Sequence, residues 1–391
     1  MCEQISYFRN EYITDNQQLL INNLIPWWFN NLVPKRNCEI KFLNNPMFDL
    51  KLLCFITLLL HACTSNREFD SNCITIDFWY GDHQSFGNPG LAQRWINILG
   101  NVSAEHGIKS LYYKLNDSDS NKITWGQDQH RLANPGDFNI DIHYNHLKGG
   151  TNIILVSVMD SAGHQTTKEM KFEFVKGNNW PLPYKINWAK VQNICEVAQI
   201  VDGHWKLTRD GIRTLDPWYD RIIAIGDGTW KNYEITTSVI FHGFTPPIKG
   251  PPNYGVSHAA LSMRWPGHDN DHNQPHIKWY PLGATCEFQL KKDLDSCRWR
   301  ILGDRSIKTE DSYQHFPIQL GVRYNLKSQV DNIEKDLTRY RVKIWPARND
   351  EPENWQLTAV EGAQDIQSGS ALLIAHNTDV TFGNVSIIPL E

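Results

Sequence analysis

Hydrophobic and polar residues alternate along two long parts of the chain, with the period of two that is typical of β-strands. The first part, residues 73–176, holds six such runs separated by turn residues: CITIDFWYG, RWINILGNV, SLYYKLN, DFNIDIHY, TNIILVSVMD and EMKFEFV. The last two runs flank a polar turn and predict a terminal hairpin. We therefore expect residues 73–176 to form a small β-sandwich.

The alternation stops in KGNNWPLPYKINW, where two prolines predict a linker over residues 177–187. From residue 188 to residue 391 strand-like runs follow one another closely, and none shows the periodicity of a helix. Strands at this density need two packed sheets to bury their apolar faces. The predicted fold class is all-β, with a small sandwich followed by a larger one.

Both parts resemble known families. The first is similar to Ig-like and cadherin-like modules in its terminal hairpin, but it lacks the Cys, Trp, Cys spacing of a true immunoglobulin domain. The second resembles the concanavalin A-like (laminin G-like) jelly-roll superfamily of lectins and glucanases, through WKNYEITTSVIFHGF, through GVRYNLKSQV followed by RYRVKIWPA, and through GSALLIAHNTDVTFGNVSI. The resemblance implies that GVRYNLKSQV and RYRVKIWPA are adjacent strands of a concave sheet. It implies a fold more than a chemistry, because such sheets carry lectins, hydrolases, lyases and adhesion modules.

One apolar run, from Leu52 to Leu60, lies within MFDLKLLCFITLLLHACTSN. A lysine before it and small residues after it give the order of a secretory signal over residues 47–63. The run is shorter than the about 20 residues that a membrane-spanning helix needs. Its tail, LHAC, resembles the bacterial lipobox except at His61, which implies lipid attachment at Cys63. Secretion with ordinary cleavage and a buried core helix are the alternatives.

This interpretation predicts where in the cell the protein is located. Residues 1–46 are then a leader ahead of a true start at Met47, the alternative being a cytoplasmic extension, and residues 64–72 are a tether. We expect an exported protein of the bacterial cell envelope that is lipid-anchored at the outer membrane or the cell surface. The lipid would be its only contact with the membrane.

Charge and cysteine content refine this expectation. The net charge is −5 and no block of five like charges occurs, which argues against nucleic acid as a partner. Once the leader cysteines and Cys63 are set aside, four cysteines remain, an even number that permits disulfides in an exported chain. Cys286 and Cys297 flank a polar turn between two strand-like runs, so they are predicted to bridge a hairpin, with free buried thiols as the alternative.

The densest polar cluster is RWPGHDNDHNQPHIKWYP, residues 264–281. Its histidines and carboxylates are candidate metal ligands, with calcium as the cofactor to consider: His268, Asp269, Asp271, His272 and His276. Its aromatic rings could stack on sugar faces while carboxylates take hydrogen bonds from hydroxyls, which predicts carbohydrate binding through Trp265, Trp279, Tyr280, Asp269 and Asp271. A solvated loop with its aromatics folded into the sandwich edge is the alternative.

Catalytic candidates lie on the strands. No E-x-D-x-E run occurs, which disfavours a glucanase of the usual type. In VSHAALSMRW, a period of two places His258 and Arg264 on one face, and His242 is expected nearby, so that a lyase acting on uronates could use His as base and Arg to neutralise the acid. The alternative is a satisfied histidine beside a surface arginine.

Three functions follow from these patterns. The first is an exported, lipid-anchored protein whose jelly roll binds a glycan or polysaccharide. The second is a polysaccharide lyase or unusual glycoside hydrolase that works through the same His/Arg face. The third is a structural adhesion or envelope protein without glycan activity.

Overall fold

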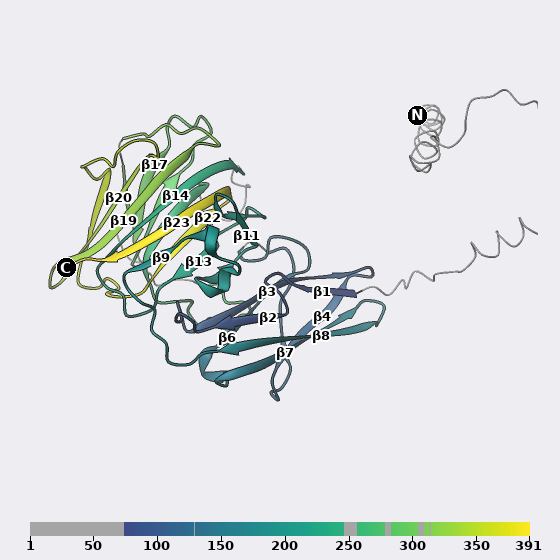
Figure 1. Cartoon of the computed structure of the whole chain (residues 1–391). Helices are drawn as coiled ribbons and strands as arrows, with labels where there is room; N and C mark the ends of the chain where they lie inside the picture. Colours follow the sequence, from purple (N-terminus) through teal and green to yellow (C-terminus); the bar gives the residue numbers. More distant parts are fainter. Residues whose placement is uncertain (1–73, 129, 246–255, 278–282, 304–308, 313) are drawn as a thin grey trace, which may run out of the picture. The chain divides into compact units, whose positions relative to one another are not determined.

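The computed structural model describes residues 74–391 except residues 129, 246–255, 278–282, 304–308 and 313. The regular elements of these residues are strands and short 3-10 helices (Figure 1), so the all-β prediction is confirmed. Within this described part, no helix has the length and apolar character needed to cross a membrane. The predicted signal segment, Cys63 and the tether lie outside the described residues, as do Trp279 and Tyr280.

Two sheets pack face to face in the N-terminal part. One has the order β1-β3-β6, with bounds Ile74–Phe78, Trp95–Ala104 and Asp137–His143. The other has the order β2-β8-β7-β4-β5, with bounds His83–Phe86, Gln165–Phe174, Gly150–Asp160, Ile108–Leu115 and Asn121–Lys122. The alternation of β7 buries every second side chain, and the buried sides of both sheets share one apolar core. The predicted small sandwich is therefore present, while its Ig-like character and its exact bounds stay predictions.

Two larger sheets form the C-terminal part. The first has seven strands in the order β10 (Gln199–Asp202), β13 (Arg221–Ile225), β22 (Ser370–His376), β15 (His258–Trp265), β16 (Ala284–Gln289), β17 (Arg298–Gly303) and β18 (Thr309–Asp311). The second has the order β11 (Trp205–Thr208), β12 (Gly211–Thr214), β23 (Thr378–Pro389), β14 (Tyr233–Phe244), β19 (Arg323–Glu334), β20 (Leu337–Pro346) and β21 (Leu357–Glu361), and β9 (Tyr184–Ile186) pairs with β23 as its eighth strand. The predicted adjacent strands are β19 and β20, and their pairing is confirmed.

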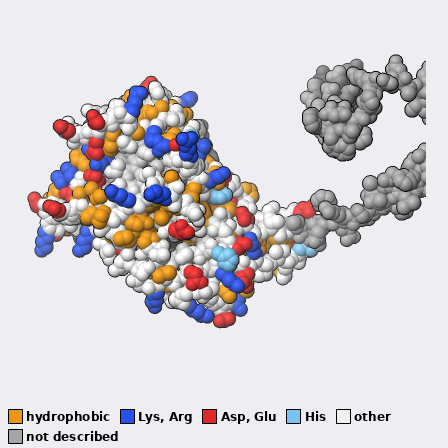
Figure 2. All heavy atoms as spheres, viewed as in Figure 1, with side chains coloured by type: hydrophobic (Ala, Val, Ile, Leu, Met, Phe, Trp, Pro, Cys, Tyr) orange, Lys and Arg blue, Asp and Glu red, His pale blue; other side chains and the backbone are white. Residues whose placement is uncertain are grey.

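The outer faces of these two sheets differ in exposure. In β14, β19 and β20 buried and partly exposed residues alternate, so that one face of the eight-stranded sheet packs on the core and the other meets solvent. Lys and Arg side chains, with hydrophobic ones between them, are spread over this region of the surface in Figure 2. In β13, β15, β16 and β22, by contrast, every residue is buried, so polar side chains on their outer face are shielded from water.

The predicted disulfide is not formed. Cys286 and Cys297 are both buried, free thiols. The reason is the register of the hairpin: Cys286 of β16 pairs with Ile301 of β17, so Cys297, which precedes β17, does not lie opposite Cys286. Because a disulfide needs closely facing Cβ atoms, this register prevents the bridge.

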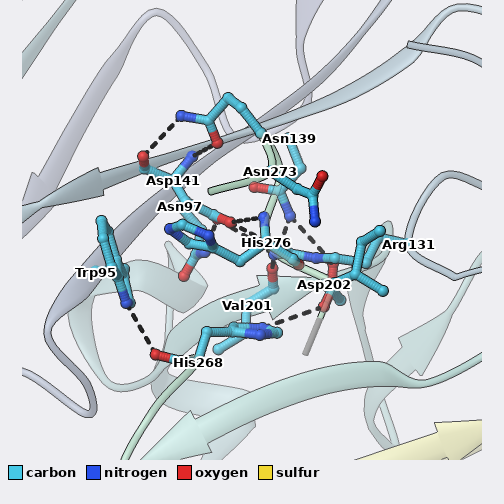
Figure 3. A network of polar contacts seen from close by, with 12 residues as sticks. Trp95, Asn97, Arg131, Asn139, Asp141, Val201, Asp202, His268, Asn273 and His276 are labelled. Atoms are coloured by element: carbon cyan, nitrogen blue, oxygen red, sulfur yellow. Dashed lines mark hydrogen bonds and ion pairs between the residues drawn. The ribbon is translucent and has the colours of Figure 1, made fainter. Parts of the chain in front are cut away.

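A buried arginine joins the two sandwiches (Figure 3). Arg131 is 5% exposed; its Nη1 lies 2.6 Å from Asp141 Oδ2 on β6, and its Nε lies 2.6 Å from Asp202 Oδ1 at the end of β10. The same guanidinium donates to the carbonyls of His276 (2.7 Å) and Val201 (3.0 Å). Burial raises the pKa of Asp202 to about 6, against the opposing charge of Arg131. Arg131 is thus the counter-ion of two buried carboxylates, one from each sandwich.

Replacing Arg131 tests this role. Arg131→Met removes the cation that hydrogen-bonds both buried carboxylates, and we expect a loss of about 3–5 kcal/mol in the free energy of unfolding, measured by urea denaturation. The matched control is Arg213→Met, because Arg213 pairs with Asp379 at 2.7 Å but is partly exposed. We expect that pair to contribute no more than about 1 kcal/mol. Equal losses in the two variants would contradict the role given to Arg131.

Candidate functional site

The loop that follows β15 folds into the contact with the N-terminal sandwich. Trp265 is completely buried, and its ring packs edge-on against His268 at 5.5 Å. A sugar ring cannot stack on a tryptophan in that position, which corrects the predicted role of Trp265. Trp279 and Tyr280 lie outside the described residues, so their role in carbohydrate binding stays a prediction.

The five predicted metal ligands of this loop do not gather around one point. His276 is buried with its Nδ1 3.0 Å from Asp271 Oδ1, while Asp271 Oδ2 accepts from the backbone of Ile277 at 2.8 Å. The backbone N–H of His276 donates to Asp141, and the carbonyl of His268 accepts from Trp95 (Figure 3).

The remaining members of that set point elsewhere. His272 is exposed, and its φ of 61° places it in the left-handed region of a turn, while Asp269 is partly buried. Among the described residues, the groups of side chains that could hold a metal lie in two other places and include none of the five. Calcium binding in this loop therefore stays a prediction, and the observed contacts close the loop rather than open a cation site.

Arg264 leaves the face on which the alternation placed it. A bulge lies between Ser262 and Trp265, and Arg264 takes a φ of 57°. Its side chain is fully buried, and its five guanidinium hydrogens are matched by five acceptors: Lys231 O, Thr338 Oγ1, Ile366 O, Asn232 Oδ1 and Asn332 Oδ1. Since no donor remains for a ligand, the predicted catalytic role of Arg264 is corrected to a structural one.

His242 does not join His258 either. It lies on β14 of the eight-stranded sheet, with its Nε2 2.8 Å from Thr381 Oγ1 on β23. His258 lies on β15 of the seven-stranded sheet. The expected proximity of these two histidines is therefore wrong, because the strands that carry them belong to different layers.

His258 is instead part of a polar row across the outer face of the seven-stranded sheet. Antiparallel register pairs His258 with His376 of β22 on one side and with Gln289 of β16 on the other, and Gln289 in turn pairs with Arg298 of β17. Directly paired residues project to the same face of a sheet. Four strands thus present His376, His258, Gln289 and Arg298 side by side, which we call the His–His–Gln–Arg row.

Carboxylates stand beside this row. Asp220, which precedes β13, places its Oδ1 2.8 Å from His376 Nδ1. Glu287 lies two residues before Gln289 on β16 and accepts a hydrogen bond of 3.0 Å from the Gln289 amide. Glu287 pairs with Arg300 of β17, so a second arginine lies in the neighbouring row.

The two imidazoles of the row are held in one orientation. Their rings stack in parallel, with centroids 4.7 Å apart and planes 3° apart. His258 Nδ1 lies 2.8 Å from the carbonyl of Val256, and His376 Nδ1 faces Asp220, so both rings carry their proton on Nδ1. The Nε2 of His376 is buried and has no hydrogen-bond partner within the described part of the chain. Its lone pair is therefore unsatisfied within the described residues, although His376 is only 3% exposed.

Burial and neighbouring charges set the ionisation of the site. Burial lowers the pKa of His258, and the negative charge of Glu287 opposes this effect. Burial would raise the pKa of Asp220, but the charge and hydrogen bond of His376 hold it below its usual value. At neutral pH the site therefore has a neutral His258 and an ionised Asp220, and Asp220 orients the ring of His376 as a carboxylate orients a general base.

The same residues offer one ligand atom each within 4.8 Å: Asp220, His258 and His376. Imidazole nitrogens suit zinc better than calcium. However, a metal ion lies in the plane of each ring that binds it, and parallel stacked rings have no common plane. The observed geometry favours proton transfer over metal binding.

No family model and no curated protein matches this chain. Three solved structures show partial likeness. The exoplasmic/lumenal domain of VIP36 in its Ca²⁺/Man2-bound form is 11% identical over 55% of this chain and 90% of that chain, with a TM-score of 0.35. The alginate lyase Aly36B in complex with an alginate trisaccharide is 14% identical over 54% of this chain and 100% of that chain, with a TM-score of 0.30, and a carbohydrate-binding module of the β-sandwich superfamily is 10% identical over 82% of this chain and 97% of that chain, with a TM-score of 0.17. With TM-scores this low, the chemistry of the site has to be inferred from its own residues.

The charge of Glu287 gives a direct test of the site's electrostatics. Glu287→Gln removes a negative charge that raises the pKa of His258, so we expect this pKa to fall further below its ordinary value. The measurement is an NMR titration of the histidine ring signals. His242 serves as the internal control, because its charged neighbours are Arg213, Asp379 and Asp210. A pKa of His258 that does not change would contradict the assigned contact.

Proposed function

We propose that the protein binds an acidic polysaccharide on the outer face of its seven-stranded sheet and cleaves it by elimination next to a uronate. The observation that carries the proposal is the His–His–Gln–Arg row, in which two imidazoles and two groups suited to a carboxylate share one face. Neighbouring strands are about 4.8 Å apart, so the row extends over about 14 Å. That length suits a few linked sugar rings.

The basic end of the row supports an anionic substrate. Arg298 and Arg300 are partly exposed on β17, next to Gln289 and Glu287. A guanidinium binds a carboxylate through two parallel hydrogen bonds, and an amide adds a further donor. Arg298 lies three strands from His376, so it is suited to bind the carboxylate of a neighbouring uronate and to position the polysaccharide over the histidines. This positioning role replaces the one that the sequence had assigned to Arg264.

The histidine end supplies the base. His376 takes the proton from the carbon next to the carboxylate through its Nε2, while Asp220 stabilises the charge that forms on the ring. The electron pair of the broken C–H bond forms a C=C bond, and the glycosidic oxygen on the next carbon leaves with a proton. Tyr219, whose ring packs against His376 at 4.8 Å, offers a phenol to deliver that proton.

A second candidate function is lectin-like binding on the opposite sheet. An open groove of about 670 Å³ runs along the outer face of β14, β19 and β23. Its lining is rich in hydrogen-bonding side chains that suit sugar hydroxyls: Lys185, Asn187, Thr236, Ser238, Arg323 and Asn325. Arg323 is held in place by Asp210 at 2.7 Å and by Ser238 at 2.8 Å. Lectin-like binding requires no catalytic group, so the hydrogen-bonding side chains of this groove would suffice for binding without turnover.

Export to the cell envelope and lipid attachment at Cys63 are part of the same proposal. Their support is the signal-like order of residues 47–63. An extracellular location would bring the site into contact with polysaccharides. Mass spectrometry of the mature protein tests this part separately, because an N-terminus at a lipid-modified Cys63 is expected.

The elimination activity can be assayed on the full chain. We expect polyuronates such as alginate or polygalacturonate to give products with ultraviolet absorbance from the new C=C bond, and neutral mannan to give none. His376→Ala removes the base and Arg298→Ala removes the carboxylate partner, and each should lower kcat/KM by about 100-fold or more. The matched control is His242→Ala, on the other sheet, which should keep full activity.

Three outcomes separate the candidates. Turnover that depends on His376 and Arg298 supports the lyase. Glycan binding without products, weakened by Asn325→Ala in the groove but not by His376→Ala, would overturn the lyase in favour of the lectin. No binding and no turnover with any glycan would overturn both, and the structural role as an adhesion or envelope protein would then be the one that stands.

A further inference from the structure

Two turns at one end of the N-terminal sandwich bring together a second group of ionisable side chains. His106 lies in the turn between β3 and β4, and Asp160 and His164 bound the turn between β7 and β8. The backbone of Ser161 donates a hydrogen bond of 2.9 Å to the carbonyl of Gly107, which ties the two turns to each other. The rings of His106 and His164 are 5.6 Å apart.

Asp160 is held rigidly at the base of this group. Its side chain is almost fully buried, and its Oδ1 accepts from the backbone of Ala162 (2.9 Å) and of His164 (2.8 Å). Its Oδ2 lies 2.8 Å from His164 Nδ1. Although burial acts to raise the pKa of Asp160, the hydrogen bonds from His164 and the backbone hold it below its usual value. The carboxylate is therefore ionised and oriented before any ligand arrives.

We propose that His106, Asp160 and His164 form a binding site for a divalent transition-metal ion such as Zn²⁺. One ligand atom of each residue lies within 4.8 Å of the other two. Ligands of a tetrahedral zinc ion, at about 2.0–2.1 Å from the metal, are about 3.3 Å apart. The adjustment needed is at most about 1.5 Å, and His106 can make it because it is exposed on a turn.

Ring orientation distinguishes this group from the one at Asp220. The planes of His106 and His164 are inclined at 39°, so a small rotation lets both lone pairs meet at one ion. Two imidazoles and one carboxylate select zinc, copper or nickel over calcium or magnesium. Water would fill the fourth position, as in zinc sites with three protein ligands.

Binding is coupled to proton release. The proton between His164 Nδ1 and Asp160 Oδ2 has to leave when both atoms bind the ion. Because metal ligands have to be deprotonated to bind, affinity should fall as the pH is lowered. The bound ion would also link the two turns and raise the melting temperature of the protein.

Calorimetric titration of the full chain with Zn²⁺ tests the site. We expect one equivalent to be lost, or bound about tenfold more weakly or worse, in His106→Ala and in His164→Ala. His83→Ala, a change at an exposed histidine of the same sandwich, should bind as the parent does. His376→Ala should also bind as the parent does, which keeps the group at Asp220 separate.

Two results would overturn the proposal. One is the absence of Zn²⁺ binding to the parent chain at millimolar metal. The other is equal binding by the parent and by a His106→Ala/His164→Ala double variant with an unchanged circular dichroism spectrum. Zinc-induced shifts of the His106 and His164 ring signals in NMR spectra, lost together on adding a chelator, would support it.

Discussion

The hydrogen-bonded register of four neighbouring strands, β22, β15, β16 and β17, is the constraint on which the candidate site depends. Each ladder fixes which residue stands opposite which, and together they place His376, His258, Gln289 and Arg298 in line. A slip of one residue in any ladder would turn that strand's member of the row to the opposite face. The core beneath opposes such a slip, because Leu261, Leu373 and Cys286 of these strands are fully buried in it.

Burial then gives the polar residues of this protein two distinct roles. Arg131 and Arg264 are shielded from water and surrounded by acceptors, so they stabilise the fold and have little left for a ligand. His376 is shielded as well, but its Nε2 has no hydrogen-bond partner among the described residues. A buried polar atom without a partner lowers stability, and a bound ligand is one physical reason for its presence. The presence or absence of hydrogen-bond partners thus separates the structural arginines from His376 as a candidate base.

Period-two alternation predicted much of the fold, because strands such as β14, β19 and β20 have one buried face and one face that meets solvent. YEITTSVIFHGF is β14, and the two runs named as adjacent strands pair as β19 and β20. The site was predictable only in part. His258 was identified from its own strand, but the bulge at Arg264 breaks the alternation with a φ of 57°, which the residue types do not indicate. Asp220 and His376 were missed because they are 156 positions apart, and only the register of β13, β22 and β15 brings them to His258. The burial of Trp265 likewise depends on tertiary packing that a local pattern does not contain.

The central claim is that the His–His–Gln–Arg row receives an acidic glycan. Its most direct measurement is the NMR spectrum of the ¹⁵N-labelled histidine rings while a uronate oligosaccharide is added. The account predicts that the Nε2 signals of His376 and His258 shift with saturable dependence on the oligosaccharide, while the signal of His242 on the opposite sheet does not move. Oligosaccharide binding that leaves both His376 and His258 unchanged would contradict the account.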